Sequence, residues 1–227
     1  MSVLSHAARI AGKDLRIELR SKEIVFTMAF FGALIVIIYA FVFPSNKPDV
    51  VLLASPGMLW VAMAFAGTIG LGRAFDRERE NDTMRALLLA PIPRLSVFLG
   101  KAASITFLVL SVAIVVTPLL GLFLEAPLFN NLPMLAAALV LGAFGFAIVG
   151  SVFAAMLLKV RSRDVLLPVV LYPILIPLFV AGTTVTEQLI ADVVRLDIAW
   201  YWIKFLALYD AAFLVLSLWI FESLVIE

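Results

Sequence analysis

The residues with the clearest chemical pattern lie in one charged segment, 73–94, of an otherwise apolar chain. The second apolar segment is expected to run on into water as a charged helix through Glu80, after which Asn81, Asp82 or Thr83 can cap a second short helix that Pro91 ends. One side of that helix is apolar and is surrounded by charges, which is typical of a surface that docks into another protein. A short helix lying against a bilayer is the other interpretation. The candidate contact residues are Glu78, Arg79, Glu80, Asn81, Asp82, Met84, Arg85, Leu87, Leu88 and Pro91.

Asp210 is the one acidic residue well inside an apolar segment. Because a carboxyl group is costly to place in hydrocarbon, Asp210 is a candidate for a role in transport. Lys204, one and a half helical turns away, is not an ideal partner. Pro173 and Pro177 interrupt a neighbouring apolar segment and are expected to bend its helix. Such a bend can serve a moving gate, although static bends are equally typical of membrane helices.

The chain lacks the residues that catalysis, metal binding and nucleotide hydrolysis need. It has no cysteine and a single histidine, His6, so neither a thiolate nor a histidine pair can hold a metal or a haem iron. Lone methionines in apolar segments, such as Met63 and Met156, usually pack rather than ligate. No Gly-x-x-x-x-Gly-Lys-Ser/Thr loop is present, so any ATP must be bound by a partner. We expect no catalytic residue, no metal site and no cofactor bound by this chain.

The elements that position these residues are predicted to be membrane-spanning helices. Of the 227 residues, 64% are hydrophobic and 15% are charged, and the mean hydropathy is +1.13, which a water-soluble domain could not bury. A span needs about 20 apolar residues. The sequence therefore predicts an all-α integral membrane protein with six spans, at about 24–43, 50–71, 95–124, 132–158, 165–185 and 200–226.

The first 23 residues precede the spans and are predicted to form an amphipathic helix in the membrane interface. Its apolar face carries Leu4, Ala8, Ala11, Leu15 and Leu19. It is expected to be either a lever leading into the first span or a plain anchor. The six-helix domain then covers residues 24–227, and no signal peptide is expected.

The orientation follows from the cations. Most of the 17 Lys and Arg residues fall in the N-terminal segment and in the loops after spans two and four, so both termini are expected to be cytoplasmic. Trp200, Tyr201 and Trp202 then lie at the outer end of span six. They are expected to form an interfacial aromatic belt, with a stacking site for a ring ligand as the sharper alternative. The net charge of +1 argues against a nucleic-acid partner.

Several motifs resemble one known family. The motif Pro56-Gly57-x-x-Trp60 runs into the charged segment 72–82, and Leu87-Leu88-Leu89-Ala90-Pro91 and Gly100-Lys101 follow. Together with the proline-rich stretch 166–178, they resemble the permease subunit of the cytochrome c maturation ABC transporter, the haem exporter protein B family within the ABC-2 permease class. Many members have glycine where Asp82 stands and an acid where Gly72 stands.

The resemblance implies partners and a mechanism. It implies that two copies pair and that a cytoplasmic ABC ATPase, which binds the ATP, grips the segment from Glu78 to Pro91 as a coupling helix. The implied complex adds a haem-handling membrane protein, a small single-span subunit and a periplasmic haem chaperone, in the bacterial inner membrane. Haem is then possible cargo, and a mechanical role is expected for this subunit. The alternatives are an ABC-2 permease for a lipid or drug, an ion-coupled secondary transporter and a structural scaffold.

Overall fold

The computed structural model describes residues 2–42, 48–80, 93–157, 160, 162–191 and 193–224. The described part consists of helices and contains no strand. The helices are α1 (Val3–Ser21), α2 (Glu23–Val42), α3 (Pro48–Glu80), α5 (Arg94–Leu124), α6 (Leu132–Met156), α7 (Arg163–Ile190) and α8 (Leu196–Leu224).

Six of these helices are long and apolar enough to cross a membrane, which confirms the predicted number of spans. Their apolar regions are Glu23–Val42, Leu53–Asp76, Arg94–Leu124, Leu132–Met156, Arg163–Ile190 and Leu196–Ile220. The expected ends differ at several helices: α7 runs five residues beyond 185, and α8 begins before 200. Apolar runs mark the part of a helix that needs lipid, whereas backbone hydrogen bonds continue through polar residues such as Thr186 and Glu187.

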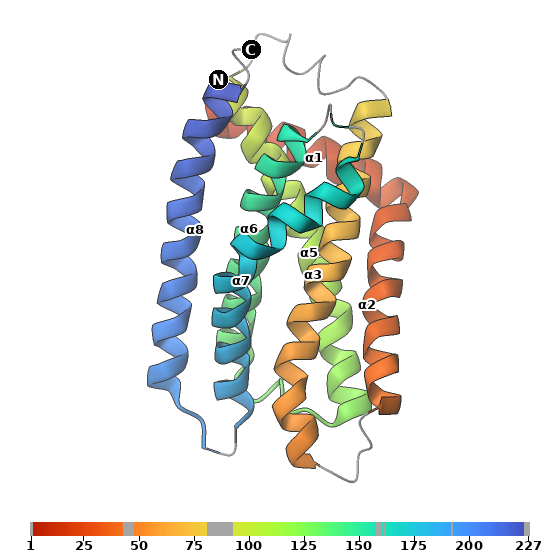
Figure 1. Cartoon of the computed structure of the whole chain (residues 1–227), viewed down its shortest axis with the longest axis vertical. Coiled ribbons are helices and arrows are strands. Elements are labelled where there is room, and N and C mark those ends of the chain that lie inside the picture. Colours follow the sequence, from red (N-terminus) through yellow and green to blue (C-terminus); the bar gives the residue numbers. More distant parts are fainter. Residues whose placement is uncertain are drawn as a thin grey trace.

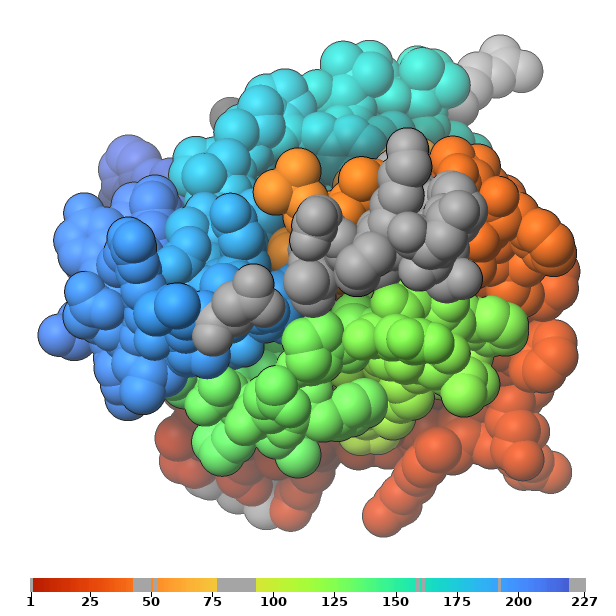
Figure 2. Space-filling model, turned by 90° about the horizontal axis from the view of Figure 1, so that it is seen from below, coloured from red at the N-terminus to blue at the C-terminus, as the bar shows by residue number. Residues whose placement is uncertain are grey.

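The six long helices run roughly side by side, with α2 and α8 on opposite sides of the bundle (Figure 1). The view from below agrees, since the red-orange α2 and the blue α8 lie at opposite edges (Figure 2). α1 lies across one end of the bundle, at which α8 also ends (Figure 1). We call this the α1 end, and the other the far end.

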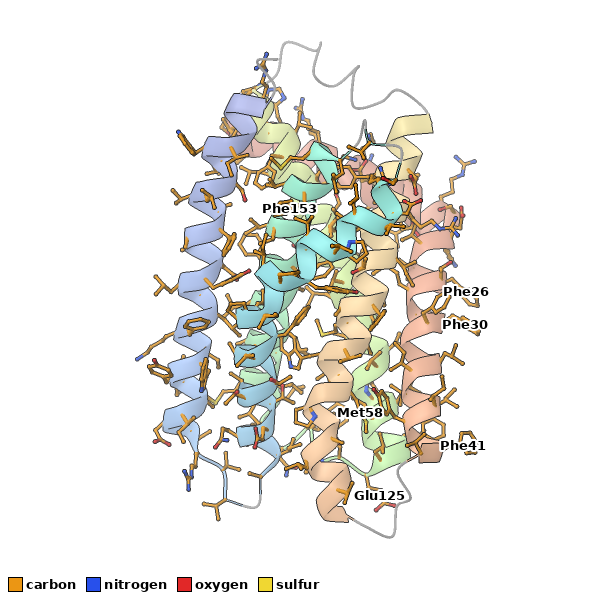
Figure 3. All side chains as sticks on the ribbon, viewed as in Figure 1. Phe26, Phe30, Phe41, Met58, Glu125 and Phe153 are labelled. Atoms are coloured by element: carbon orange, nitrogen blue, oxygen red, sulfur yellow. The ribbon has the colours of Figure 1, made fainter. Side chains whose placement is uncertain are left out.

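α2 is the helix that the bundle covers least. Its side chains Phe26, Phe30 and Phe41 point outward, away from the other helices (Figure 3), and 87% of Phe41 is exposed. In water such a face would be unstable, but in hydrocarbon it meets a solvent of its own polarity. The composition of α2 therefore fits a helix at the lipid-facing edge of the bundle.

α7 does not run straight. Its first part crosses the bundle obliquely from the α1 end, and the rest turns to run along the other helices (Figure 1). Pro168, Pro173 and Pro177 all lie inside this helix, and each removes a backbone donor and pushes on the preceding turn. The bend expected from the prolines is thus present, and it carries the start of α7 over to the end of α3.

Candidate functional site

The predicted docking segment, 78–91, begins at the α1 end of the bundle, where α3 ends (Figure 1). Glu78, Arg79 and Glu80 form the last turn of α3, as the helix expected to run on past the second span requires. The remaining predicted contacts, Asn81, Asp82, Met84, Arg85, Leu87, Leu88 and Pro91, lie outside the described residues. The structure does describe the two flanking helices, since α3 ends at Glu80 and α5 begins at Arg94.

The end of α3 is fastened to α7 by a buried arginine. Arg163 opens α7 and is only 1% exposed. Its Nη2 donates to Asp76 Oδ1 at 2.6 Å and to the carbonyl oxygen of Gly72 at 3.0 Å. A charge-assisted bond of this kind is about twice as strong as a neutral one, provided both groups are held in place. The oblique start of α7 is therefore held to the end of α3.

Sequence reasoning used Arg163 only as a cation that sets the orientation. Its contact with Asp76 joins residues 87 positions apart, and no motif connects them. One feature of the sequence could have identified Arg163, namely that it is a basic residue at the first position of an apolar helix. Such a residue must either reach water or find an acid, and in this chain the acid comes from another helix.

The start of α5 is fastened to α1 in a similar way. Lys101 Nζ donates to Asp14 Oδ2 at 2.5 Å, and Lys101 is 6% exposed. Next to it, Gly100 leaves room for α1: a Cβ there would lie 2.9 Å from the carbonyl oxygen of Ala7 and 2.8 Å from Cβ of Ile10. The face of α1 that packs on α5 thus carries Ala7, Ile10 and Asp14, whereas the predicted apolar face still exposes Leu4 and Leu19.

A single carboxylate joins α1 to α2. Glu18 Oε1 accepts hydrogen bonds from the backbone N–H groups of Ile24 at 2.7 Å and Val25 at 2.9 Å. These are two of the donors that the first turn of a helix leaves unpaired, and a negative charge suits that end. Lys22, between the helices, has a φ of 56°, the left-handed value that makes the sharp corner. The direction of α2 is therefore tied to that of α1.

Together these contacts connect both flanks of the docking segment to the rest of the bundle. α3 is joined to α7 through Arg163, and α5 is joined to α1 through Lys101 and then to α2 through Glu18. Each joint uses a buried charge with a defined partner, so it resists sliding more than apolar packing does. These contacts therefore link α3 and α5 to three further helices, α7, α1 and α2.

Deeper in the bundle, Trp60 of the predicted Pro-Gly-x-x-Trp motif is locked between α6 and α7. Trp60 is 1% exposed, and its Nε1 donates to Thr186 Oγ1 at 3.0 Å. Its ring lies against Gly142 and Gly182, where any Cβ would collide with it. Small residues in a membrane helix are typical of close packing, and at Gly142, Gly145 and Gly150 of α6 an added Cβ would meet a side chain of another helix. The indole itself was not anticipated as the partner.

Asp210 lies at the middle of α8 and is 3% exposed. Neither of its carboxyl oxygens has a hydrogen-bond partner within the described part of the chain. It faces Gly145 and Leu178. Lys204 is exposed, so it does not pair with Asp210. The structure thus places Asp210 among apolar atoms on α6 and α7.

The predicted intramembrane prolines lie near Asp210 along α7. Pro173 and Pro177 are themselves exposed, and Ile174 lies between them. The hydroxyl of Tyr209, next to Asp210, donates to the carbonyl oxygen of Ile174 at 2.8 Å. The prolines and Asp210 are therefore linked through one hydrogen bond rather than through direct contact.

The three aromatic residues predicted as an interfacial belt lie in the first turns of α8, at the far end. Trp200 and Tyr201 are exposed, and Trp202 turns inward to meet the ring of Phe205 edge-on at 5.5 Å. Tyr201 and Trp202 are themselves edge-on at 5.6 Å. Outward rings at a helix end fit a belt. Among the described residues no three His, Cys, Asp or Glu side chains form a possible metal site.

Comparison with known proteins gives a consistent result. The sequence model of a family described as CcmB protein matches residues 5–225. The chain is 26% identical to the Heme exporter protein B of Pseudomonas aeruginosa over 72% of each chain. It is also 26% identical to the proteins of that name from Rhodobacter capsulatus, over 79% of this chain and 81% of the relative, and from Bradyrhizobium diazoefficiens, over 84% and 83%.

Proposed function

Because the chain belongs to the CcmB protein family, we propose that it is the membrane permease subunit of an ABC transporter for haem export and delivery in c-type cytochrome assembly. Relatives over most of its length are named Heme exporter protein B. The chain is a multi-pass membrane protein, with six helices long and apolar enough to span a bilayer. In this proposal it is a transport subunit rather than an enzyme.

The proposed energy source is a cytoplasmic ABC ATPase that binds residues 78–91. The observation that carries this step is the fastening of both flanking helices: Arg163 holds α3 to α7, and Lys101 holds α5 to α1. A segment gripped by a moving partner is useful only if its flanks transmit the motion. ATP then stays on the partner, and this chain supplies the lever.

The same proposal sets the orientation and the other partners. The α1 end, with Arg163 and Lys101, is cytoplasmic, and Trp200 and Tyr201 lie at the periplasmic surface of the bacterial inner membrane. The proposed complex contains a second copy of this chain, a haem-handling membrane protein, a small single-span subunit and a periplasmic haem chaperone. Lipid, or the second copy, covers the outward phenylalanines of α2.

Haem is cargo of the complex in this proposal and is not ligated here. Axial ligands of haem iron are most often His, Met, Cys or Tyr. His6 lies in α1 at the proposed cytoplasmic end, and Met63 is buried in the core. Because no histidine faces the periplasm to hold the iron, the role proposed for this subunit is mechanical, namely the use of ATP-driven helix motion to release the loaded chaperone.

Co-purification tests the ATPase step. The tagged chain, extracted from its native membrane in mild detergent, is expected to bring an ABC ATPase with it. Leu87→Arg should abolish this association, because it places a charge on the apolar side of the predicted docking helix. Val193→Arg is the matched control, because this residue is 76% exposed at the far end. Isolation of the folded parent chain without any ATPase would contradict the proposal.

Haem staining of membrane proteins from a deletion strain tests the substrate separately. Loss of c-type cytochromes, restored by the parent chain and not by Leu87→Arg, is the expected result. Normal cytochromes together with a co-purifying ATPase would instead indicate an ABC-2 permease for a lipid or a drug.

One observation favours a second candidate, an ion-coupled transporter that works alone: Asp210 is buried without a partner among the described residues. In that case Asp210→Asn abolishes transport while Leu87→Arg does not change it. The ABC proposal predicts that Leu87→Arg abolishes transport.

A further inference from the structure

Asp210 stands at the middle of α8, which in a membrane-spanning helix is the depth at which a charge is most costly. It is fourteen residues from either end of α8, about 21 Å at the rise of an α-helix. Water cannot reach it in this packing, since only 3% of the residue is exposed. An ionised carboxylate at such a depth needs a cation or several donors to replace its water.

The helices around Asp210 provide neither a cation nor free hydrogen-bond donors among the described residues. α8 packs against α5, α6 and α7, and α6 contains no ionisable residue. On α5 and α7, Lys101 is bonded to Asp14, Arg163 to Asp76, and the Tyr172 hydroxyl lies 3.2 Å from Thr68 Oγ1. Among the ionisable side chains of α5, α7 and α8 whose burial the structure describes, the remaining ones are exposed, namely Arg94, Asp164, Glu187, Asp197, Tyr201 and Lys204. The hydroxyl of Tyr209 is used by the Ile174 carbonyl.

The carboxyl group is also held by shape. α6 approaches so closely that a Cβ at Gly145 would collide with Asp210 Oδ1, and it would lie 3.4 Å from Cγ. The same Cβ would meet Leu178 of α7. A notch made by a glycine, a leucine and a helix backbone suits a compact neutral group and has no room for a hydrated ion.

We propose that Asp210 is a proton-binding site, which holds one proton while α8 is packed against Gly145 of α6 and releases it when the two helices separate and water enters. The ligand class is the proton, because binding it removes the charge without adding volume. The proposal rests on the geometry of α8 and goes beyond the proposed ATPase coupling. It makes α6–α8 contact sensitive to pH.

Infrared difference spectroscopy of the purified parent chain and Asp210→Asn, at neutral pH in detergent, measures the state of the group directly. The expected difference contains the C=O band of a neutral carboxylic acid that the variant lacks. The paired bands of a carboxylate in its place would overturn the proposal. If the helical circular dichroism of Asp210→Asn shows that this variant does not fold, Asp210→Ala replaces it in the comparison of infrared spectra.

A pH series of unfolding in mixed micelles supplies the second readout. If the folded chain holds a proton that the unfolded chain has released, the parent loses stability relative to Asp210→Asn as pH rises, by up to tenfold in the unfolding equilibrium constant per pH unit. Asp164→Asn, a variant at an 85% exposed side chain, should show no such divergence from the parent. Equal pH dependence in the parent and in Asp210→Asn would show that Asp210 takes up no proton on packing.

Discussion

The packing of Trp60 leads to the sharpest prediction about stability. In Gly182→Ala, the added Cβ would lie 2.6 Å from Cη2 of the indole and nearer still to two other ring atoms. Ordinary carbon contacts need about 3.5–4.0 Å, so α7 or the ring must shift by about 1 Å. An indole cannot fold away as a flexible side chain would. Overpacking of this kind costs about 1–3 kcal/mol.

A shift of the ring also strains the bond from Trp60 Nε1 to Thr186, which contributes about 1 kcal/mol. We therefore expect Gly182→Ala to lower the free energy of unfolding by about 2–4 kcal/mol, measured by SDS titration in mixed micelles. Gly57→Ala is the matched control, since its Cβ would meet nothing within 4 Å. It should be neutral or slightly stabilising, because alanine is the better helix former.

A double-mutant cycle identifies the cause. If the indole is what the new methyl meets, the cost of Gly182→Ala should be much smaller in a Trp60→Leu background, with a coupling of about 1–3 kcal/mol. Additive costs, or a Gly182→Ala variant as stable as Gly57→Ala, would refute the reasoning that the indole fills this notch.

Three further predictions concern the joints at the α1 end. Asp76→Asn should lower the free energy of unfolding by about 2–4 kcal/mol, which is less than for a fully buried pair because 34% of the Asp76 side chain is exposed. Arg163→Gln should lower it less, since this variant leaves an acid that water can reach. Thermal unfolding in detergent ranks the two variants. Glu18→Gln should lower the free energy of unfolding by about 1 kcal/mol. It should also speed hydrogen exchange at the backbone amides of Ile24 and Val25, which Glu18 caps. Because the chain has no cysteine, Ile10→Cys makes a single label site. A water-soluble maleimide should label the Ile10→Cys variant slowly and should label the double variant with Gly100→Val quickly, because the added side chain displaces α1.

The spans could be predicted from the sequence because hydrocarbon imposes a simple condition on each of them separately. A run such as 132–158 has to pair its backbone internally, so its length and polarity suffice to identify a helix. The charged extension of α3 through Glu80 followed in the same way, from helix-forming residues after an apolar run. The packing role of the α6 glycines was also readable, since small residues mark close helix contacts.

The pairing between helices could not be predicted. Trp60 and Thr186 are 126 residues apart, and helical periodicity gives the face on which each lies without naming the helix opposite. The same holds for Arg163 with Asp76. For α1, the periodic pattern revealed the face with Leu4 and Leu19, whereas the face that packs on α5 depends on Gly100, a residue whose only signal is the absence of a side chain.

The two faces of α1 are expected to act one after the other while the chain is being synthesised. Asp14 and its partner Lys101 are 87 residues apart, and ribosomes add roughly 5–20 residues per second. For several seconds, therefore, α1 has been made and its docking surface has not. During that interval the exposed leucines, Leu4 and Leu19, can keep α1 on the membrane surface. The helix then has only to slide in two dimensions to meet α5, so assembly begins as a search within the membrane plane.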